Sequence, residues 1–373
     1  NASVITQPDS LCWLLNIRGS DVPRTPIIQC FAVISSDGNV TLFCDPLKFS
    51  KVNLNFNVNL LDWDNFAPYL QSFEGKILID PSSMPHAAME ALEMGPSETI
   101  RSVDPCALPK ACKNNVELVG ARAAHLRDGA AIVEFLAWFD TADKSSLSEI
   151  DIVEKLEGFR AATKLLHDIS FDTISGSGPH GAIVHYRVNY DTNRKLDSDS
   201  VLLVDSGAQY HDGTTDITRT LPLGKPSHEM VQAFTRVLQG MIAISQVRFP
   251  KGLTGRDLDA LARAPLWAAG QDYDHGTGHG VGSFLSVHEG PQRISRATDV
   301  VLEPGMILSN EPGYYRAGAF GIRTENLILV QPAPDLPGGD NRIMLEFETI
   351  TYAPIDLRLI DAKMLTRKEK NWL

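Results

Sequence analysis

The chain has 373 residues, of which 43% are hydrophobic and 21% charged, so it has a globular composition and the length of two domains. Its formal net charge of -12 argues against nucleic acid or an anionic membrane as the main partner. No apolar run approaches the ~18 residues of a membrane-spanning helix. The five cysteines are scattered and no signal peptide is recognisable, which predicts a reducing, cytoplasmic location without a disulfide framework.

The first part of the chain, residues 1–108, is predicted to be a small α/β domain. Apolar runs bounded by turn residues predict three strands and one helix, namely Ile27–Ile34, Val40–Cys44 and Lys76–Asp80 for the strands and Met84–Met94 for the helix. Two prolines and a cysteine lie between Asp104 and Pro109, and we place the domain boundary there.

The second part, residues 109–373, is predicted to be an α+β domain. A capping box of Asn114 and Glu117 opens a helix that continues through Phe139. Three further helices are expected at Ile150–His167, Ser227–Phe249 and Thr254–Ala269. Strand-like segments, Ser200–Tyr210 and Thr214–Leu221, flank a turn signal and predict a hairpin. Residues 276–353 indicate mainly strands and glycine-rich loops.

Two aspartates of the predicted hairpin are the first candidate site residues. Asp205 ends the buried run Val201–Val204, and Asp216 lies across the turn. The hairpin can bring both carboxylates to one face, where each would raise the pKa of the other unless cations neutralise them. A structural alternative stays open, in which Asp205 ends a strand and Asp216 pairs with Arg219.

Three histidines follow within a short stretch that is rich in glycine, at His275, His279 and His288. The glycines disfavour a helical H-x-x-x-H zinc site, and they do not fit a nucleotide-binding loop. Glycine on both sides of His279 would let the backbone approach a bound group closely. Each histidine alone could be structural, but three around one loop indicate a site.

Two glutamates complete the candidate set. Glu311 and Glu325 both stand in apolar β-like runs, where a buried carboxylate is costly without a partner. Arg323 could be the partner of Glu325; a metal pair is the alternative. Together, Asp205, Asp216, Glu311 and Glu325 would balance the charge of two divalent cations, with His279 as an imidazole ligand. Spacing alone does not show that these five residues converge.

At this point the sequence resembles the Xaa-Pro aminopeptidases (aminopeptidase P) of the pita-bread metallopeptidase family over its whole length. The motifs that carry the resemblance are Leu14–Val22, Gly181–Tyr186, Val204–Tyr210, Asp212–Thr220, His275–Gly282, Asn310–Tyr315 and Gly321–Asn326. The family order Asp, Asp, His, Glu, Glu is complete.

The resemblance implies a role for each position. Asp205 would bind one metal ion, Asp216 and Glu325 would bridge two, and His279 and Glu311 would complete the second site. A bridging hydroxide would attack the Xaa-Pro bond, with Glu311 as the general base. Three histidines would surround the substrate: His288 and His185 would steady its carbonyl, and His275 would line the pocket. Arg323 would orient the metal-binding carboxylates. The metal would be manganese first, with zinc or cobalt as alternatives.

The resemblance also implies an architecture. Residues 109–373 would form the pita-bread catalytic domain, and residues 1–108 the second of two creatinase N-terminal-like domains, the first being absent here. Long family members are usually homodimers that take peptides with proline at the second position. No nucleic-acid or membrane partner is expected.

Several related functions remain as alternatives. A prolidase, which cuts Xaa-Pro dipeptides, shares nearly all the ligands, although Asn16–Val22 and the spacing from His279 to His288 favour the aminopeptidase. A methionine aminopeptidase would leave the N-terminal domain unexplained. A metal-free creatinase-like hydrolase and a non-catalytic peptide-binding module are both disfavoured because every ligand position is filled.

Overall fold

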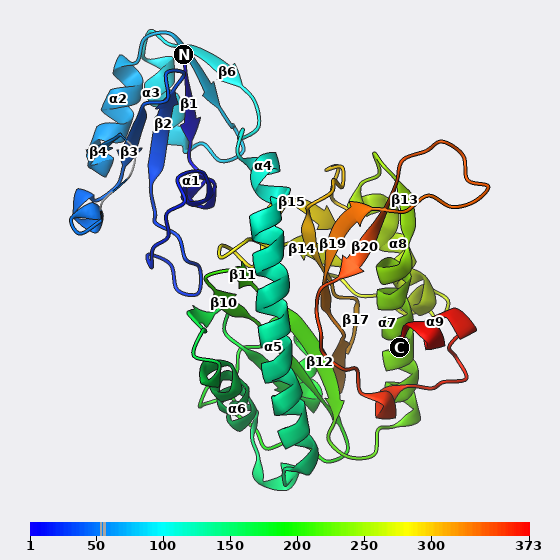
Figure 1. Ribbon diagram of the computed structural model, residues 1–373. Helices are drawn as coiled ribbons and strands as arrows, with labels where there is room; N and C mark the ends of the chain where they lie inside the picture. Colours follow the sequence, from blue (N-terminus) through cyan, green and yellow to red (C-terminus); the bar gives the residue numbers. More distant parts are fainter. Residues whose placement is uncertain (53, 55–56) are drawn as a thin grey trace. The chain divides into compact units, whose positions relative to one another are not determined.

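The structure, a computed structural model, describes residues 1–52, 54 and 57–373. The chain divides into two compact units, Asn1–Lys110 and Ala111–Leu373 (Figure 1). The division follows Lys110, close to the boundary that the prolines suggested after residue 108. In the described part of the chain, none of the helices has both the length and the apolar character needed to cross a membrane.

The first unit is built on one mixed sheet with the strand order β4-β3-β2-β1-β5-β6. Its strands are β1 (Ala2–Ile5), β2 (Phe31–Ser35), β3 (Val40–Phe43), β4 (Val58–Leu61), β5 (Lys76–Ile79) and β6 (Glu98–Arg101). Its helices are α1 (Pro8–Leu14), α2 (Phe66–Ser72) and α3 (His86–Glu93), while α4 (Ala107–Ala111) spans the division. Buried apolar side chains of the sheet and of α2 and α3 form its core. The α/β prediction for this unit is therefore confirmed.

One predicted strand of the first unit begins later than the apolar run does. The run from Ile27 to Ile34 is extended, but β2 starts only at Phe31. The residues before it bond to a preceding loop instead: Asp21 N donates to Ile27 O, and Gln29 N donates to Asp21 Oδ2. Apolar periodicity cannot separate these two kinds of pairing.

Four helices of the second unit match the predicted helices in type but not always in length. They are α5 (Asn115–Thr141), α6 (Glu149–Ala162), α7 (His228–Gln246) and α8 (Gly255–Trp267), followed by α9 (Arg367–Trp372) near the end. The Asn114 capping box is confirmed, because Asn114 Oδ1 accepts from Glu117 N at 3.1 Å and Glu117 Oε2 accepts from Asn114 N at 2.9 Å.

The predicted ends of two helices are wrong for the same reason. Helix α6 stops before Lys164, which has a φ of 59°, and His167 N then donates to Gln209 O of a sheet. Helix α7 stops before Arg248, whose strand pairs with the far end of the domain sheet. Sheet hydrogen bonds therefore take over from the helical pattern at both ends.

The strands of the second unit form several antiparallel sheets. Two sheets of three strands have the orders β11-β10-β7 and β12-β9-β8, a larger sheet has the order β13-β20-β19-β16-β14-β15, and β17 pairs with β18. The bounds are β7 (Asp168–Ile169), β8 (Ile174–Ser177), β9 (Val201–Ser206), β10 (Ala208–Tyr210), β11 (Gly213–Thr214), β12 (Ile217–Pro222), β13 (Arg248–Pro250), β14 (Gly278–Gly280), β15 (Glu289–Ile294), β16 (Ile307–Asn310), β17 (Gly313–Arg316), β18 (Phe320–Arg323), β19 (Asn326–Pro332) and β20 (Met344–Thr349).

The predicted hairpin is confirmed, with one break that matters for the site. Strand β9 pairs with β12, and β10 with β11, because the chain changes sheets at Gly207. A Cβ at Gly207 would lie 2.0 Å from Ser170 Oγ and 2.1 Å from Thr215 O. Only glycine allows this close approach. As a result Asp205, near the end of β9, and Asp216, just before the paired strand β12, lie at the same end of the two strands.

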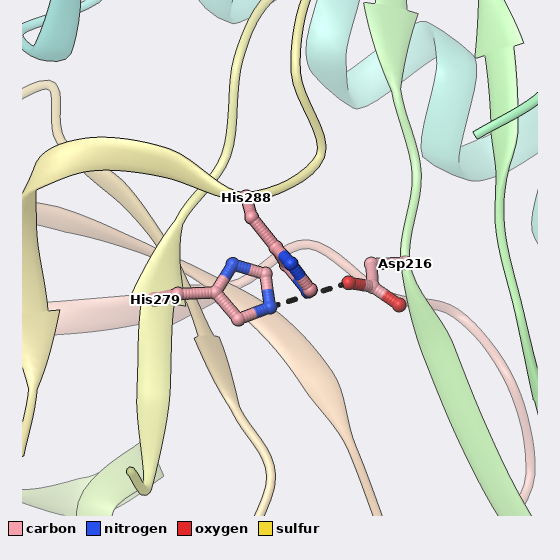
Figure 2. A group of neighbouring side chains, drawn as sticks. All are labelled: Asp216, His279 and His288. Atoms are coloured by element: carbon pink, nitrogen blue, oxygen red, sulfur yellow. Dashed lines mark ion pairs between the residues drawn. The ribbon is translucent and has the colours of Figure 1, made fainter. Parts of the chain in front are cut away.

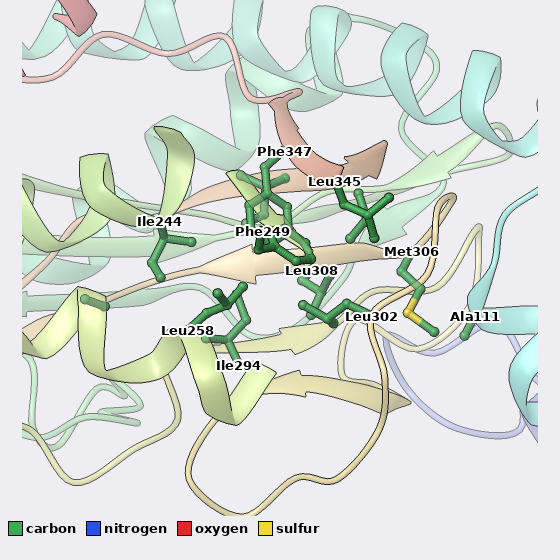
Figure 3. Close-up of a cluster of buried hydrophobic side chains, with 13 residues drawn as sticks. Ala111, Ile244, Phe249, Leu258, Ile294, Leu302, Met306, Leu308, Leu345 and Phe347 are labelled. Atoms are coloured by element: carbon green, nitrogen blue, oxygen red, sulfur yellow. The ribbon is translucent and has the colours of Figure 1, made fainter. Parts of the chain in front are cut away.

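One hydrophobic core of the second unit lies between helices α7 and α8 and the six-stranded sheet (Figure 3). Ile244 of α7 and Leu258 of α8 pack in one cluster with sheet residues that include Ile294 of β15 and Leu308 of β16. Each of these side chains is almost fully buried. The packing fixes strands β15 and β16 from behind, and both strands reach the candidate site.

A buried ion pair joins helices α5 and α6 to the hairpin. Arg160 of α6 donates to both oxygens of Asp128 of α5, at 2.8 and 3.0 Å. The same carboxylate accepts from Tyr210 Oη and from Thr215 Oγ1, each at 3.0 Å. Burial opposes ionisation of Asp128, but Arg160 and the hydroxyl donors hold its pKa below the usual value. The network fixes the backbone immediately before Asp216.

This network predicts a large loss of stability when the cation is removed. Arg160→Met should lower the free energy of unfolding by about 3–5 kcal/mol, because Asp128 would be left buried without its counter-charge. The loss should shrink as the pH is lowered, because an unpaired buried carboxyl has a raised pKa, and the folded variant therefore takes up a proton on Asp128 before the wild type does. Urea unfolding at neutral and acidic pH measures both effects.

Arg342→Gln is the matched control. Its partner Asp340 lies two residues away and both side chains are largely exposed, so the cost should stay below about 1 kcal/mol. If both variants lowered the free energy of unfolding by the same amount, the buried pair would contribute no more to stability than an exposed pair does.

Candidate metal centre

All nine residues predicted for the site line a single pocket of about 600 Å³ within the second unit: His185, Asp205, Asp216, His275, His279, His288, Glu311, Arg323 and Glu325. They come from strands β9, β14 and β18, from the residues next to β12, β16 and β19, and from loops. The structure thus brings together residues that are up to 140 positions apart (325 − 185).

Three carboxylates form the buried end of the pocket. Asp205 of β9 lies opposite Thr218 of β12, and Asp216 precedes Thr218 by two residues, so both aspartates face the same side. Glu325 N donates to Thr218 O, and Thr218 Oγ1 donates to Glu325 Oε2 at 2.8 Å. Asp205, Asp216 and Glu325 offer oxygens within 4.8 Å of one another. Strand pairing around Thr218 therefore forces the three acids together.

His279 and Glu311 stand beside this group. His279 Nε2 lies 3.4 Å from Asp216 Oδ2 and 3.3 Å from Glu311 Oε1, and Figure 2 shows the ring directed at Asp216 with His288 next to it. His279 Nδ1 contacts Gly280 O at 2.9 Å. A carbonyl can only accept, so Nδ1 carries the proton and Nε2 presents a lone pair toward the carboxylates.

The charges of the cluster are unbalanced without cations. Burial, and then the neighbouring carboxylates, raise the pKa of Asp216 and of Glu325 well above the ordinary range. Burial opposes ionisation of Glu311 as well, yet His279, His275 and Arg323 keep its pKa below the usual value. Among the described residues, nothing donates a hydrogen bond to Asp205 Oδ1.

The donor set therefore fits metal ions. Carboxylate oxygens with one imidazole suit manganese, cobalt or zinc, and two divalent cations would balance four carboxylates. The orphaned oxygen of Asp205 and the lone pair of His279 are both directed where a cation would be held. These residues fit a two-metal centre.

Two structural alternatives from the sequence are excluded. Arg219 donates to five neutral oxygens, including Glu325 O at 2.6 Å and Asn326 Oδ1 at 2.8 Å, and not to Asp216. Arg323 pairs with Asp205 Oδ2 at 2.5 Å, not with Glu325. Neither arginine therefore forms an ion pair with Asp216 or Glu325.

Tyr315 is a site residue that sequence reasoning missed. Arg323 NH1 donates to Tyr315 Oη at 2.7 Å, and the same oxygen lies 2.9 Å from His275 Nε2. The chain Asp205, Arg323, Tyr315, His275 thus links the buried acids to the pocket wall. The only sequence signal was the place of Tyr315 within the motif that contains Glu311.

The remaining histidines line the wall of the pocket. Burial lowers the pKa of His275. His288 presents part of its side chain to solvent, while its ring packs against that of His279 with 4.2 Å between the centroids. This packing partly buries the ring, and burial is the main reason that its pKa falls to about 4. His185 is exposed as well. At neutral pH His288 is therefore uncharged and can donate only one hydrogen bond.

Buried polar residues that the sequence did not reveal hold the segments of His185 and His288. Glu149 accepts from Ser177 N at 2.7 Å and from Tyr186 Oη at 3.1 Å, on both sides of His185. The loop between His279 and His288 is held by Gln209, whose Nε2 donates to Leu285 O at 2.7 Å. Such contacts join residues far apart in the sequence and leave no local pattern.

The comparisons with known families agree with this geometry. The sequence matches metallopeptidase family M24 over residues 120–332, the creatinase/prolidase N-terminal domain over residues 1–117, and the C-terminal region of peptidase M24 over residues 343–373. The expected fold, a pita-bread domain after a creatinase N-terminal-like domain, is confirmed.

Curated relatives carry peptidase names and are longer than this chain. Xaa-Pro aminopeptidase 1 of Dictyostelium discoideum is 42% identical over 384 residues, which cover 99% of this chain and 60% of the relative. Aminopeptidase P1 of Arabidopsis thaliana is 39% identical over 427 residues, covering 99% and 66%. The chain thus spans about three fifths to two thirds of the length of these relatives.

Solved structures show the same fold. An X-prolyl aminopeptidase from Caenorhabditis elegans, described as a cytosolic enzyme with a di-nuclear active site, has a TM-score of 0.89 and 34% identity, covering all of this chain and 62% of its own. Prolidase from Pyrococcus furiosus has a TM-score of 0.75 at 21% identity, covering 94% and 96%, and supports the fold alone. With the family match over more than half its length, the chain belongs to metallopeptidase family M24.

Proposed function

We propose that this chain is the catalytic part of an Xaa-Pro aminopeptidase, a metallo-aminopeptidase that hydrolyses the bond between the first residue of a peptide and a proline at the second position. The observation that carries the proposal is the convergence of Asp205, Asp216, His279, Glu311 and Glu325 in one pocket. The names of the curated relatives and the di-nuclear site of the Caenorhabditis elegans enzyme support it.

The overlap of the carboxylate groups supports a division of labour among the ligands. One close group contains Asp205, Asp216 and Glu325, another contains His279, Glu311 and Glu325, and a third contains Asp216, His279 and His288. Asp216, Glu325 and His279 each belong to two groups. A carboxylate has an oxygen for each of two ions, whereas a neutral imidazole has a single lone pair. Asp216 and Glu325 would therefore hold both cations, with Asp205 on one and His279 and Glu311 on the other. When bound, the cations would polarise the substrate carbonyl and lower the pKa of a water molecule. Manganese is our first choice.

The chain's own groups would then handle the proton and the developing charge. Glu311, ionised at neutral pH because its pKa is low, would accept the proton and pass it to the leaving proline nitrogen. His288 and His185 would donate hydrogen bonds to the carbonyl oxygen as it becomes negative. Arg323 would orient Asp205 through the bond at 2.5 Å, and His275 would close the pocket wall.

A prolidase is the second candidate, because prolidases share this fold. The higher identity to the named Xaa-Pro aminopeptidases favours the first reading. We further propose that residues 1–108 correspond to the second of the family's two N-terminal domains, and that the full-length protein is a cytoplasmic homodimer. The matched N-terminal domain and the cytosolic Caenorhabditis elegans enzyme support the first two of these points.

The substrate assignment is tested with three peptides after chelation and manganese refill. Cleavage should be restored for an Xaa-Pro-Xaa tripeptide and be at least about 100-fold weaker for Xaa-Ala-Xaa, since a site fitted to the proline ring loses its contacts with alanine. Cleavage of only the Xaa-Pro dipeptide would indicate a prolidase instead. Silence on all three, repeated with a full-length protein, would refute catalysis.

Asp216→Asn tests the two-metal centre. The variant should lose activity and bind less metal, because a shared anion is removed. In the presence of a chelator at neutral pH, the free energy of unfolding of the variant should exceed that of the wild type by about 1–3 kcal/mol, because repulsion among the carboxylates is relieved.

The pH dependence of the metal-free protein has a defined sign. The raised pKa values of Asp216 and Glu325 mean that folding takes up protons, so metal-free wild type should lose stability as the pH rises above about 4. Over the same pH range, the stability of metal-free Asp216→Asn should fall less, because one of the two carboxyls with a raised pKa is gone. Urea unfolding in chelator at several pH values measures the pH dependence of both proteins, and atomic emission measures how much metal each one binds. Full turnover in Asp216→Asn would refute the two-metal centre.

His185→Ala should separate carbonyl stabilisation from metal binding. We expect kcat to fall about 100-fold with metal content unchanged, because only a hydrogen bond to the developing oxyanion is lost. Metal loss equal to that of Asp216→Asn would place His185 among the ligands and contradict its assigned role.

A further inference from the structure

Arg293 of strand β15 is directed away from the core of its domain. Its neighbours Gln292 and Ile294 are fully buried, at 0% exposure each, whereas Arg293 is exposed. Ile294 belongs to the core cluster of Figure 3. Because successive side chains of a strand point to opposite faces, Arg293 leaves the sheet on the face opposite to that core.

The strand register places Arg293 beside the metal-binding residues. Arg293 lies directly opposite His279 in the antiparallel pair of β14 and β15, and directly opposed residues share a face. Since His279 faces the carboxylates, the side chain of Arg293 leaves the sheet on the pocket side, and it does line the pocket. Its charge also contributes to the low pKa of His288, although less than burial, His279 and His185 do.

Arg293 differs from the other arginines of the pocket in having no partner. Each of those arginines contacts a carboxylate: Arg323 contacts Asp205, Arg263 contacts Asp259, Arg296 contacts Asp272 and Arg187 contacts Asp172. Within the described ranges, Arg293 forms neither a hydrogen bond nor an ion pair. In a chain of net charge -12, this exposed guanidinium of the pocket lining is available to an anion that enters the pocket.

We propose that Arg293 binds a carboxylate of the peptide on the C-terminal side of the cleaved bond. This rests on the proposed function. The amino-terminal end of such a substrate carries an ammonium group, which Arg293 would repel, whereas a carboxylate matches the fork of a guanidinium in two hydrogen bonds. The carboxylate has two sources: the C-terminus of a short peptide, or an acidic side chain after the proline.

Arg293→Gln tests the subsite with three matched substrates. They are Xaa-Pro-Ala with a free C-terminus, its amide, and the amide of Xaa-Pro-Glu. KM should rise about fivefold for a substrate whose carboxylate reaches Arg293, with kcat little changed, as expected for an exposed charge pair. The fully amidated Ala peptide should be unaffected. The peptide whose KM rises shows whether Arg293 binds the C-terminal carboxylate or the acidic side chain. If KM rises equally for all three peptides, or does not change for any of them, the proposal is wrong.

Arg296→Gln is the matched control, because it removes the same charge from the rim of the same pocket but from an arginine already paired with Asp272 at 2.8 Å. If both variants change the three KM values alike, the effect is a general one of charge and the assignment to Arg293 is wrong.

A binding measurement separates this inference from the proposed function. Calorimetry compares Pro-Ala with Pro-Ala amide on manganese-loaded wild type and on manganese-loaded Arg293→Gln. Neither probe has proline at its second position, so binding is measured without cleavage. A preference for the free acid that disappears in the variant supports the subsite even if no peptide is hydrolysed. Absence of any preference in wild type refutes the subsite even if Xaa-Pro peptides are cleaved.

Discussion

Mutual repulsion among four converging carboxylates is the constraint on which the rest of the catalytic unit depends. Asp205, Asp216 and Glu325 are buried together, and Glu311 stands next to them. Charges at such separations in a protein interior cost several kcal/mol unless they are offset. One guanidinium, that of Arg323, offsets only part of this charge. The negative charge that Arg323 does not offset explains why the cluster fits divalent cations. Without cations, the same charge would destabilise a structural core.

Holding repelling groups in place requires a scaffold that is stable without them. The acids come from two different sheets. Hydrogen bonds from Arg219 to uncharged oxygens join these sheets at the back of the site. Arg219 of β12 donates to Glu325 O at 2.6 Å and to Ala353 O at 2.7 Å, while the core of Figure 3 fixes β15 and β16 against the helices. The stabilising interactions thus lie behind the site, and the pocket side is left free for ligands.

Local sequence signals predicted the local structure well and the convergence poorly. The capping box at Asn114 and the hairpin around residue 211 were readable because their partners are close in sequence. The partner of Arg323 was not, because Asp205 lies 118 positions away. The resemblance to a known family named the nine pocket residues. Tyr315 and Gln209 stand in motifs that carry the resemblance, but neither was assigned to the site, because their contacts exist only in the folded chain.

The same Coulomb argument that accounts for the acids extends to the mouth of the pocket. Once cations balance the carboxylates, the guanidinium of Arg293 is a cation in the pocket without a counter-charge among the described residues. A peptide carries opposite charges at its two ends, so a fixed cation beside the strand of His279 favours one direction of binding and disfavours the reverse. In the proposed peptidase, strand register would therefore set both the position of the reacting groups and the orientation of the substrate relative to them.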